Sequence, residues 1–167
     1  MLAERMKIFE EGFGAIKESM EMLLRQSDAK IVLLIDKDGR LITTAGDIGG
    51  LDLASFASLS AADFSATSQI AMLIGEEDFD TLYHQGKRQH LYFTTITEGI
   101  ILAIIFDEKT TLGLVRVRIK NTKEELRKIF DTVFTKERER ESAAATTPPN
   151  MEDISKEIED ELDKLFG

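Results

Sequence analysis

The residues that could take part in chemistry are few in this chain, and their spacing matches no catalytic or metal-binding motif. The two histidines, His84 and His90, stand near Asp78 and Asp80, and imidazole with carboxylate is a common metal-ligand combination. The histidines form no HxH or HxxxH pair, and a turn expected at Gly86 separates them. We therefore expect histidines at a turn or a dimer edge, with a metal site as the less favoured alternative.

The other common catalytic groups are missing or wrongly spaced. There is no cysteine, which excludes thiolate nucleophiles, disulfides and Cys-ligated metals. The segment GEEDF after Ile74 lacks the GxxxxGK[ST] pattern of a phosphate-binding loop. No GxSxG elbow surrounds the clustered serines, Ser55, Ser58, Ser60, Ser65 and Ser68. We expect no catalytic residue, no cofactor and no bound metal.

Length and composition indicate one acidic domain. The chain has 167 residues, of which 43% are hydrophobic, enough for one ordinary core. Its formal net charge of −10 would repel a phosphate backbone, which argues against nucleic acid as a partner. The first residues are charged and amphipathic, unlike a signal peptide, and no apolar run is long enough to span a bilayer. We expect a cytoplasmic protein without a membrane span.

Apolar periodicity and turn residues predict three long helices and five strands. The helices are expected at residues 2–25, 51–74 and 110–135, and the strands at 30–36, 40–45, 82–84, 91–96 and 100–106. Residues 31–35 and 100–106 are apolar without alternation, which indicates central strands covered on both faces. Residues 115–119 alternate as in a strand, but the wider apolar spacing and the charge pairs around them favour a helix.

The predicted second helix is unusual because it contains no Lys or Arg. Its only charges are Asp52 and Asp63, and Gly75 is expected to end it. On a helical wheel one side carries Phe56, Leu59, Ala66, Ile70 and Leu73, which we expect to pack on the sheet. The opposite side is a stripe of mostly small residues that would let a partner approach closely, Ala54, Ser58, Ala61, Ala62, Ser65, Ser68 and Met72. We expect this stripe to bind a partner; the alternative is a helix buried inside its own domain.

The composition changes after the third helix. Residues 137–150 combine alternating charge with both prolines of the chain, Pro148 and Pro149, and are expected to form a flexible linker. Residues 151–167 predict an acidic amphipathic helix whose apolar line consists of Ile154, Ile158, Leu162, Leu165 and Phe166. A helix this short needs a groove to hold it. We expect the groove to belong to a partner; the alternative is packing on its own core.

The order of elements and five sequence runs resemble a known family. The runs are AKIVLLIDKDGRLITTAG, ASLSA, AMLIGEEDF, YHQGKRQHLYFTTI and ILAIIFDEKTTLGLVRVRIK. They resemble the roadblock (dynein light chain type) domain, in particular the MglB-type regulators of bacterial gliding motility and cell polarity. Family members usually have Gly-Asn where this chain has Ala62-Asp63, and we assign no role to Asp63.

The resemblance implies an α+β fold of the roadblock/profilin-like type, over residues 1–136. A five-stranded antiparallel sheet would carry the first and last helices on one face and the second helix on the other. Two protomers would join edge to edge through the third strand, near residues 79–85. The residues at that dimer interface would be Phe79, Leu82, Tyr83 and His84.

The resemblance also implies a function. Such homodimers stimulate GTP hydrolysis by a Ras-like small GTPase of the MglA type in its GTP-bound state, in the cytoplasm and in some cases at a cell pole. Because the predicted docking helix offers no Arg, acceleration would come from reordering the GTPase's own switch regions. Arg40, Arg88 and Arg116 are the rivals for an arginine-finger role. From its apolar line and its linker, rather than from the resemblance, we expect the C-terminal helix to tune binding or nucleotide exchange. The alternative is a non-catalytic roadblock scaffold that joins other proteins.

Overall fold

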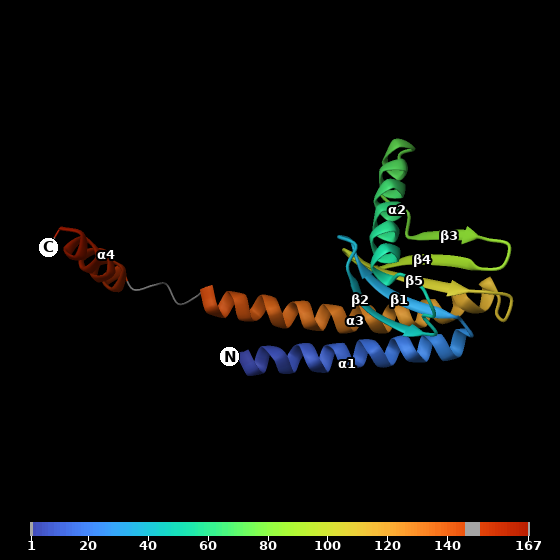
Figure 1. The fold of residues 1–167 in the computed structure, drawn as a ribbon, viewed down its shortest axis with the longest axis horizontal. Helices are drawn as coiled ribbons and strands as arrows, with labels where there is room; N and C mark the ends of the chain where they lie inside the picture. Colours follow the sequence, from blue (N-terminus) through green and yellow to red (C-terminus); the bar gives the residue numbers. More distant parts are fainter. Residues whose placement is uncertain (1, 146–150, 167) are drawn as a thin grey trace. The chain divides into compact units, whose positions relative to one another are not determined.

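The structure, a computed structural model, describes the backbone of residues 2–145 and 151–166 and the side chains of residues 10–145 and 154–166. It divides into two compact units, Met1–Val133 and Phe134–Gly167. The first unit contains a sheet with helices on both faces (Figure 1). The elements in chain order are α1 (Leu2–Ser27), β1 (Ile31–Asp36), β2 (Leu41–Gly46), α2 (Leu53–Leu73), β3 (Thr81–Gln85), β4 (His90–Thr97), β5 (Ile100–Phe106), α3 (Leu112–Ala145) and α4 (Met151–Phe166).

The five strands form one antiparallel sheet in the order β2-β1-β5-β4-β3. β1 and β5 are the inner apolar strands, paired from Ile31 opposite Ile105 to Asp36 opposite Ile100. Nearly all of their side chains are buried, which confirms the prediction that both faces are covered. β3 is an edge strand, paired on one side only, with β4.

Alternate side chains of the sheet supply two apolar layers. The layer under α2 includes Ile31, Leu33, Phe93 and Ala103, packed against Ala57 and Phe64 of the helix. The opposite face carries the intervening residues and is covered by α1 and α3 (Figure 1). Polar contacts join that layer as well: the Ser19 hydroxyl on α1 donates to Glu125 on α3 at 2.9 Å. The expected arrangement, with the second helix alone on its face, is confirmed.

The caps of α2 are built from the residues that begin and end its sequence pattern. Asp52 is the N-cap, and its carboxylate accepts hydrogen bonds from the Ser55 hydroxyl at 2.6 Å and the Ser55 amide at 3.1 Å. These bonds hold the pKa of Asp52 below its ordinary value. At the other end Gly75 takes a φ of +85°, and the Glu76 amide donates to the Ala71 carbonyl. The predicted end of the helix at Gly75 is confirmed.

The third long helix is longer than the sequence indicated. α3 is helical as predicted, but it continues to Ala145 and so includes residues 137–145, which we expected in the linker. Apart from Ser142 these residues are Glu, Arg and Ala, which have high helix propensity, and they contain no Gly or Pro. The rest of the expected linker, with Pro148 and Pro149, lies outside the described residues. Where the sequence predicts a C-terminal helix, the structure has α4, Met151–Phe166.

Candidate partner-binding surface

The side of α2 that packs on the sheet is lined mainly by small residues. The buried residues of the helix are Ala57, Ser60, Ala61, Phe64 and Ala71. Our prediction that Ala61 belongs to an exposed docking stripe is therefore wrong, since the side chain is 7% exposed and faces the core. Small side chains bring the helix backbone close to the sheet; Phe64 is the large apolar side chain buried there, and Leu53 and Phe56 pack beside it half-buried.

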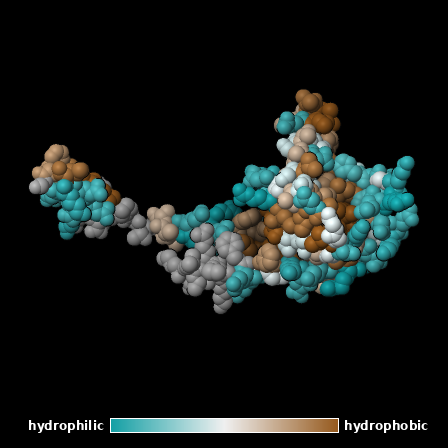
Figure 2. Space-filling view, in the orientation of Figure 1, coloured by the Kyte–Doolittle hydropathy of each residue, from teal (hydrophilic) through white to brown (hydrophobic). Residues whose placement is uncertain are grey.

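The large apolar residues of α2 point away from the core instead. Leu59, Ile70 and Leu73 are 70%, 53% and 86% exposed, and Ala66 between them is also exposed. The prediction that these four residues pack on the sheet is wrong; of the predicted set only Phe56 packs against the core, half-buried. We call Leu59, Ala66, Ile70 and Leu73 the apolar flank. Figure 2 shows hydrophobic surface at the projecting end of α2.

The overhang of α2 explains this surface. A helix of 21 residues is about 32 Å long, whereas the outer strands of a five-stranded sheet lie only about 19 Å apart. In Figure 1 α2 crosses the sheet steeply and its C-terminal turns extend beyond β3. The apolar residues there have no strand beneath them. The mismatch between helix length and sheet width is the sequence signal that could have identified the apolar flank.

Of the seven residues in the predicted docking stripe, all are exposed except Ala61, which is buried, and Ser68, which is half-buried. Ala54, Ser58, Ala62, Ser65 and Met72 are exposed, as the prediction requires. We call these five residues the small stripe. It borders the β1–β2 turn, because a Cβ added at Gly39 would lie only 3.0 Å from the Ser58 Cα. Ser68 is half-buried, and its hydroxyl donates to Asp78 at 2.8 Å.

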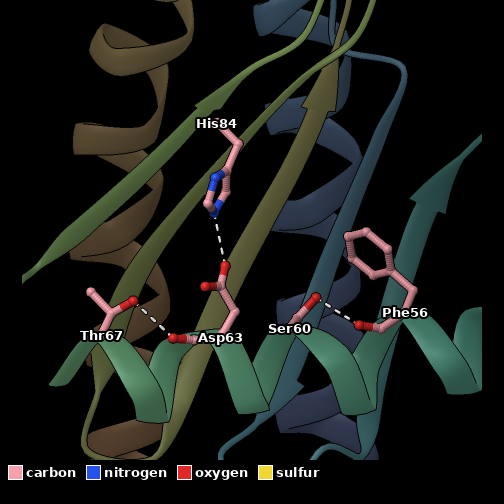
Figure 3. Close-up of polar contacts among 5 residues, drawn as sticks. All are labelled: Phe56, Ser60, Asp63, Thr67 and His84. Carbon is pink, nitrogen blue, oxygen red and sulfur yellow. Dashed lines mark hydrogen bonds and ion pairs between the residues drawn. The ribbon is translucent and has the colours of Figure 1, made fainter. Parts of the chain in front are cut away.

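Asp63, to which we assigned no role, has a partner on the edge strand. Its Oδ2 lies 2.8 Å from Nε2 of His84 on β3 (Figure 3). Both side chains are partly exposed, His84 by 53% and Asp63 by 39%. No short-range pattern links residues 63 and 84, so sequence reasoning had no signal from which to find this contact.

The residues predicted for the dimer interface lie on β3 or just before it. Leu82 packs against the core on the α2 face, and His84 reaches Asp63 on that same face. Tyr83 points to the opposite face, where its ring stacks on Phe106 with centroids 6.3 Å apart. Phe79 is half-buried in the preceding loop. The outer backbone groups of β3 form no strand pairing within the described residues, so this edge is available to another strand.

The two histidines lie on different faces of the sheet. His84 is on the α2 face, whereas the His90 ring lies 5.2 Å from the Phe106 ring on the face of α1 and α3. The Asp78 carboxylate accepts hydrogen bonds from the Ser68 hydroxyl and from the Phe79 amide. The structure thus does not bring the residues of the alternative metal site together. The described residues contain no group of three or more His, Cys, Asp or Glu placed to hold a metal ion.

The three arginines considered as fingers are exposed and lie outside α2. Arg88 follows β3 in the β3–β4 turn, and Arg116 is on α3. Arg40 follows Gly39, whose α-carbon approaches Ser58, so its backbone borders the small stripe. Of the three, Arg40 is therefore the one to test for a direct role.

α4 has the amphipathic pattern that its sequence predicts. The residues of its apolar line are exposed within the C-terminal unit, namely Ile154, Ile158, Leu162, Leu165 and Phe166. Between Ser155 and Lys164 most of the remaining positions are acidic. Among the helices of the described chain, none combines the length and apolarity needed to cross a bilayer.

Comparisons with known proteins identify the fold and the family. The Roadblock/LC7 domain model matches residues 16–106. The structure of MglB from Myxococcus xanthus is 41% identical and has a TM-score of 0.71; the match covers 72% of this chain and 91% of that one. The gliding protein MglB from Thermus thermophilus is 32% identical, with a TM-score of 0.67 and coverage of 71% and 90%.

Two further similar proteins are another MglB structure and a more distant archaeal protein. A structure of MglB with a tetrameric arrangement is 31% identical, covers 73% of this chain and 92% of that one, and has a TM-score of 0.69. An uncharacterized protein from Methanocaldococcus jannaschii is 26% identical over 98 residues, which are 59% of this chain and 84% of that protein. The family model and the similar MglB structures both identify the five-stranded sheet described above as a roadblock fold. The chain belongs to the Roadblock/LC7 domain family.

Proposed function

We propose that this protein is a homodimeric regulator of a Ras-like small GTPase of the MglA type, which it stimulates to hydrolyse GTP. The observation that carries the proposal is the outer surface of α2. It exposes small and apolar side chains on a helix with no Lys or Arg. A weakly polar surface of this kind is typical of a site for another protein. The similarity to MglB proteins supports a cytoplasmic GTPase as that partner.

In this proposal the GTPase supplies the catalytic groups. The small stripe would hold its switch regions in the arrangement that is competent for hydrolysis, which is a shift in population between states the GTPase already has. No residue of α2 can donate a positive charge to the transition state. The regulator is therefore proposed as an activator without an arginine finger.

The proposed dimer joins two sheets through their β3 edges. Two features of the chain support it. The β3 edge is unpaired within the described residues, and the apolar flank of α2 overhangs that edge. A second sheet continuing past β3 would bury this overhang, which would otherwise be exposed to water.

A GTP-turnover assay with an MglA-type GTPase tests this function. Wild-type protein is expected to raise the single-turnover rate, and Arg40→Ala is expected to stimulate as well as wild type. A loss of about 1,000-fold in Arg40→Ala would instead identify an arginine finger. A protein that binds the GTPase without changing its turnover would favour the alternative, a roadblock scaffold that joins other proteins.

We further propose that α4 is a separate module that tunes the affinity of the GTPase or its nucleotide exchange. Its apolar line is exposed and its length is marginal for a stable isolated helix. Because α4 would act as a second contact, it would raise the effective concentration of the first.

Truncation after Thr147 tests the module. The melting temperature of the dimer is expected to change little, and stimulation at saturating dimer is expected to persist. The concentration for half-maximal stimulation should change by about tenfold or more, or the rate of nucleotide release should change. A large fall in melting temperature would show instead that α4 supports its own domain.

A further inference from the structure

Two adjacent residues of α2 reach two different strands. Asp63 contacts His84 on β3 through the 2.8 Å pair, and the Phe64 ring meets the Phe93 ring of β4 edge-on, with centroids 6.3 Å apart. The His84 ring is in turn edge-on to the same Phe93 ring, with centroids 6.1 Å apart. Four side chains from three elements therefore form a closed cycle of contacts. Such a cycle restrains the rotation of α2 about its own axis as well as its position.

In the part of the chain that the structure describes, the side-chain hydrogen bonds from α2 to other elements all reach β3 or the loop before it. Within the described residues, two side-chain hydrogen bonds leave α2 beyond its N-cap, to His84 on β3 and to Asp78 in the loop before β3. The hydroxyls of Ser60 and Thr67 bond within the helix, to the carbonyls of Phe56 and Asp63 (Figure 3). Towards β1 and β2 the helix is held by apolar packing.

This arrangement joins the proposed dimer edge to the proposed docking surface. Pairing of β3 with a second copy would restrain the backbone that carries His84, and His84 holds Asp63 on the helix that carries the small stripe. We propose that Asp63 and His84 are positioning residues that couple dimerisation through β3 to presentation of the small stripe. The inference rests on the proposed function for the identity of the partner. The effect of the Asp63–His84 contact on dimerisation does not depend on that function. Since coupling is reciprocal, binding of a partner on α2 would also strengthen the dimer.

The expected size of the coupling follows from exposure. A carboxylate–imidazole contact that is half accessible to water changes an equilibrium constant by about threefold to fivefold. Removing either partner should therefore weaken the dimer by about that factor. Asp63→Asn keeps an oxygen that accepts from the imidazole N–H, so this variant should stay within about twofold of wild type.

A double-mutant cycle on the full-length protein tests the inference. The dimer dissociation constant is measured by analytical ultracentrifugation for wild type, Asp63→Ala, His84→Ala and the double variant. His84→Ala also removes the ring contact with Phe93, but it does so whether or not Asp63 is present. The difference between the two backgrounds therefore measures the interaction free energy of Asp63 with His84. The double variant should be no weaker than the weaker single variant. Thr67→Val removes a hydrogen bond of the same helix that does not reach β3, and should leave the constant unchanged.

The GTPase assay gives the second readout. Both single variants should need a proportionally higher concentration for half-maximal stimulation, with the maximal rate unchanged. Strictly additive effects, a lower melting temperature with an unaltered dimer constant, or a wild type that is monomeric at micromolar concentration would each overturn the coupling. If wild type fails to stimulate the GTPase while the cycle shows coupling, the proposed function fails and the dimerisation half of the inference holds.

Discussion

Ser65→Arg is expected to reduce the stimulation of GTP hydrolysis by about 30-fold, equivalent to roughly 2 kcal/mol at a central interface residue. Ser65 is exposed near the middle of the small stripe, where a long charged side chain would keep a partner from approaching closely. The dimer and its melting temperature should not change, because the side chain points away from the sheet. Single-turnover GTP hydrolysis measures the first effect, and calorimetry with light scattering measures the second.

Two variants control this experiment. Ser65→Ala removes the hydroxyl without adding bulk and should stimulate normally. Ala61→Arg, one helical turn earlier, places the same charge in the core and should lower the melting temperature by more than about 10 °C. If Ser65→Arg keeps full stimulation while folded, the partner docks elsewhere, and the exposed part of α2 serves only the dimer.

Ile70→Asp is expected to convert the dimer to a monomer at micromolar concentration. Ile70 lies two turns after Asp63 on the same side of α2, in the apolar flank that overhangs β3, and it is half exposed in the single chain. Burying a carboxylate there without a partner should weaken dimerisation by about 100-fold or more. Light scattering should give a mass near 18.8 kDa for the variant and twice that for wild type.

Gln69→Asp is the matched control, since it places the same carboxylate on the adjacent exposed position, which is turned by about 100° from Ile70 around the helix. It should remain dimeric. A dimeric Ile70→Asp variant would contradict the proposed interface, because it would show that the apolar flank stays in water. Monomeric Ile70→Asp that still stimulates the GTPase would show that one protomer suffices.

The succession of elements follows from the sequence because each rests on local signals. The uninterrupted apolar runs of β1 and β5 indicate central strands, and Asp52 and Gly75 mark the ends of α2. The faces of α2 do not follow from local signals. A helical wheel assigns the larger side chains to the core, but here close packing selects Ala57 and Ala61 for the sheet. A helical wheel projects all residues along the helix axis, so it does not show how far a helix extends beyond its sheet.

The Asp63–His84 contact shows a second limit. The two residues are separated by 21 positions and by the end of α2, a loop and half a strand. Which strand lies at the edge depends on the crossover that brings β5 beside β1, and that is a property of the whole sheet. Once the strand order is known, a His on the edge strand opposite an Asp on the covering helix is readily recognised as a pair.

The placement of α3 has a consequence for the timing of folding. Its buried residues, from Val115 to Phe130, complete a layer that α1 begins, and the Ser19–Glu125 hydrogen bond spans 106 positions of the chain. During synthesis the sheet can be paired as soon as β5 is made, but one of its faces stays only half covered. The ribosome must therefore release the chain as far as Phe130 before that apolar face closes. Until then α1 alone covers that face, and apolar surface exposed in this way during folding is prone to aggregation.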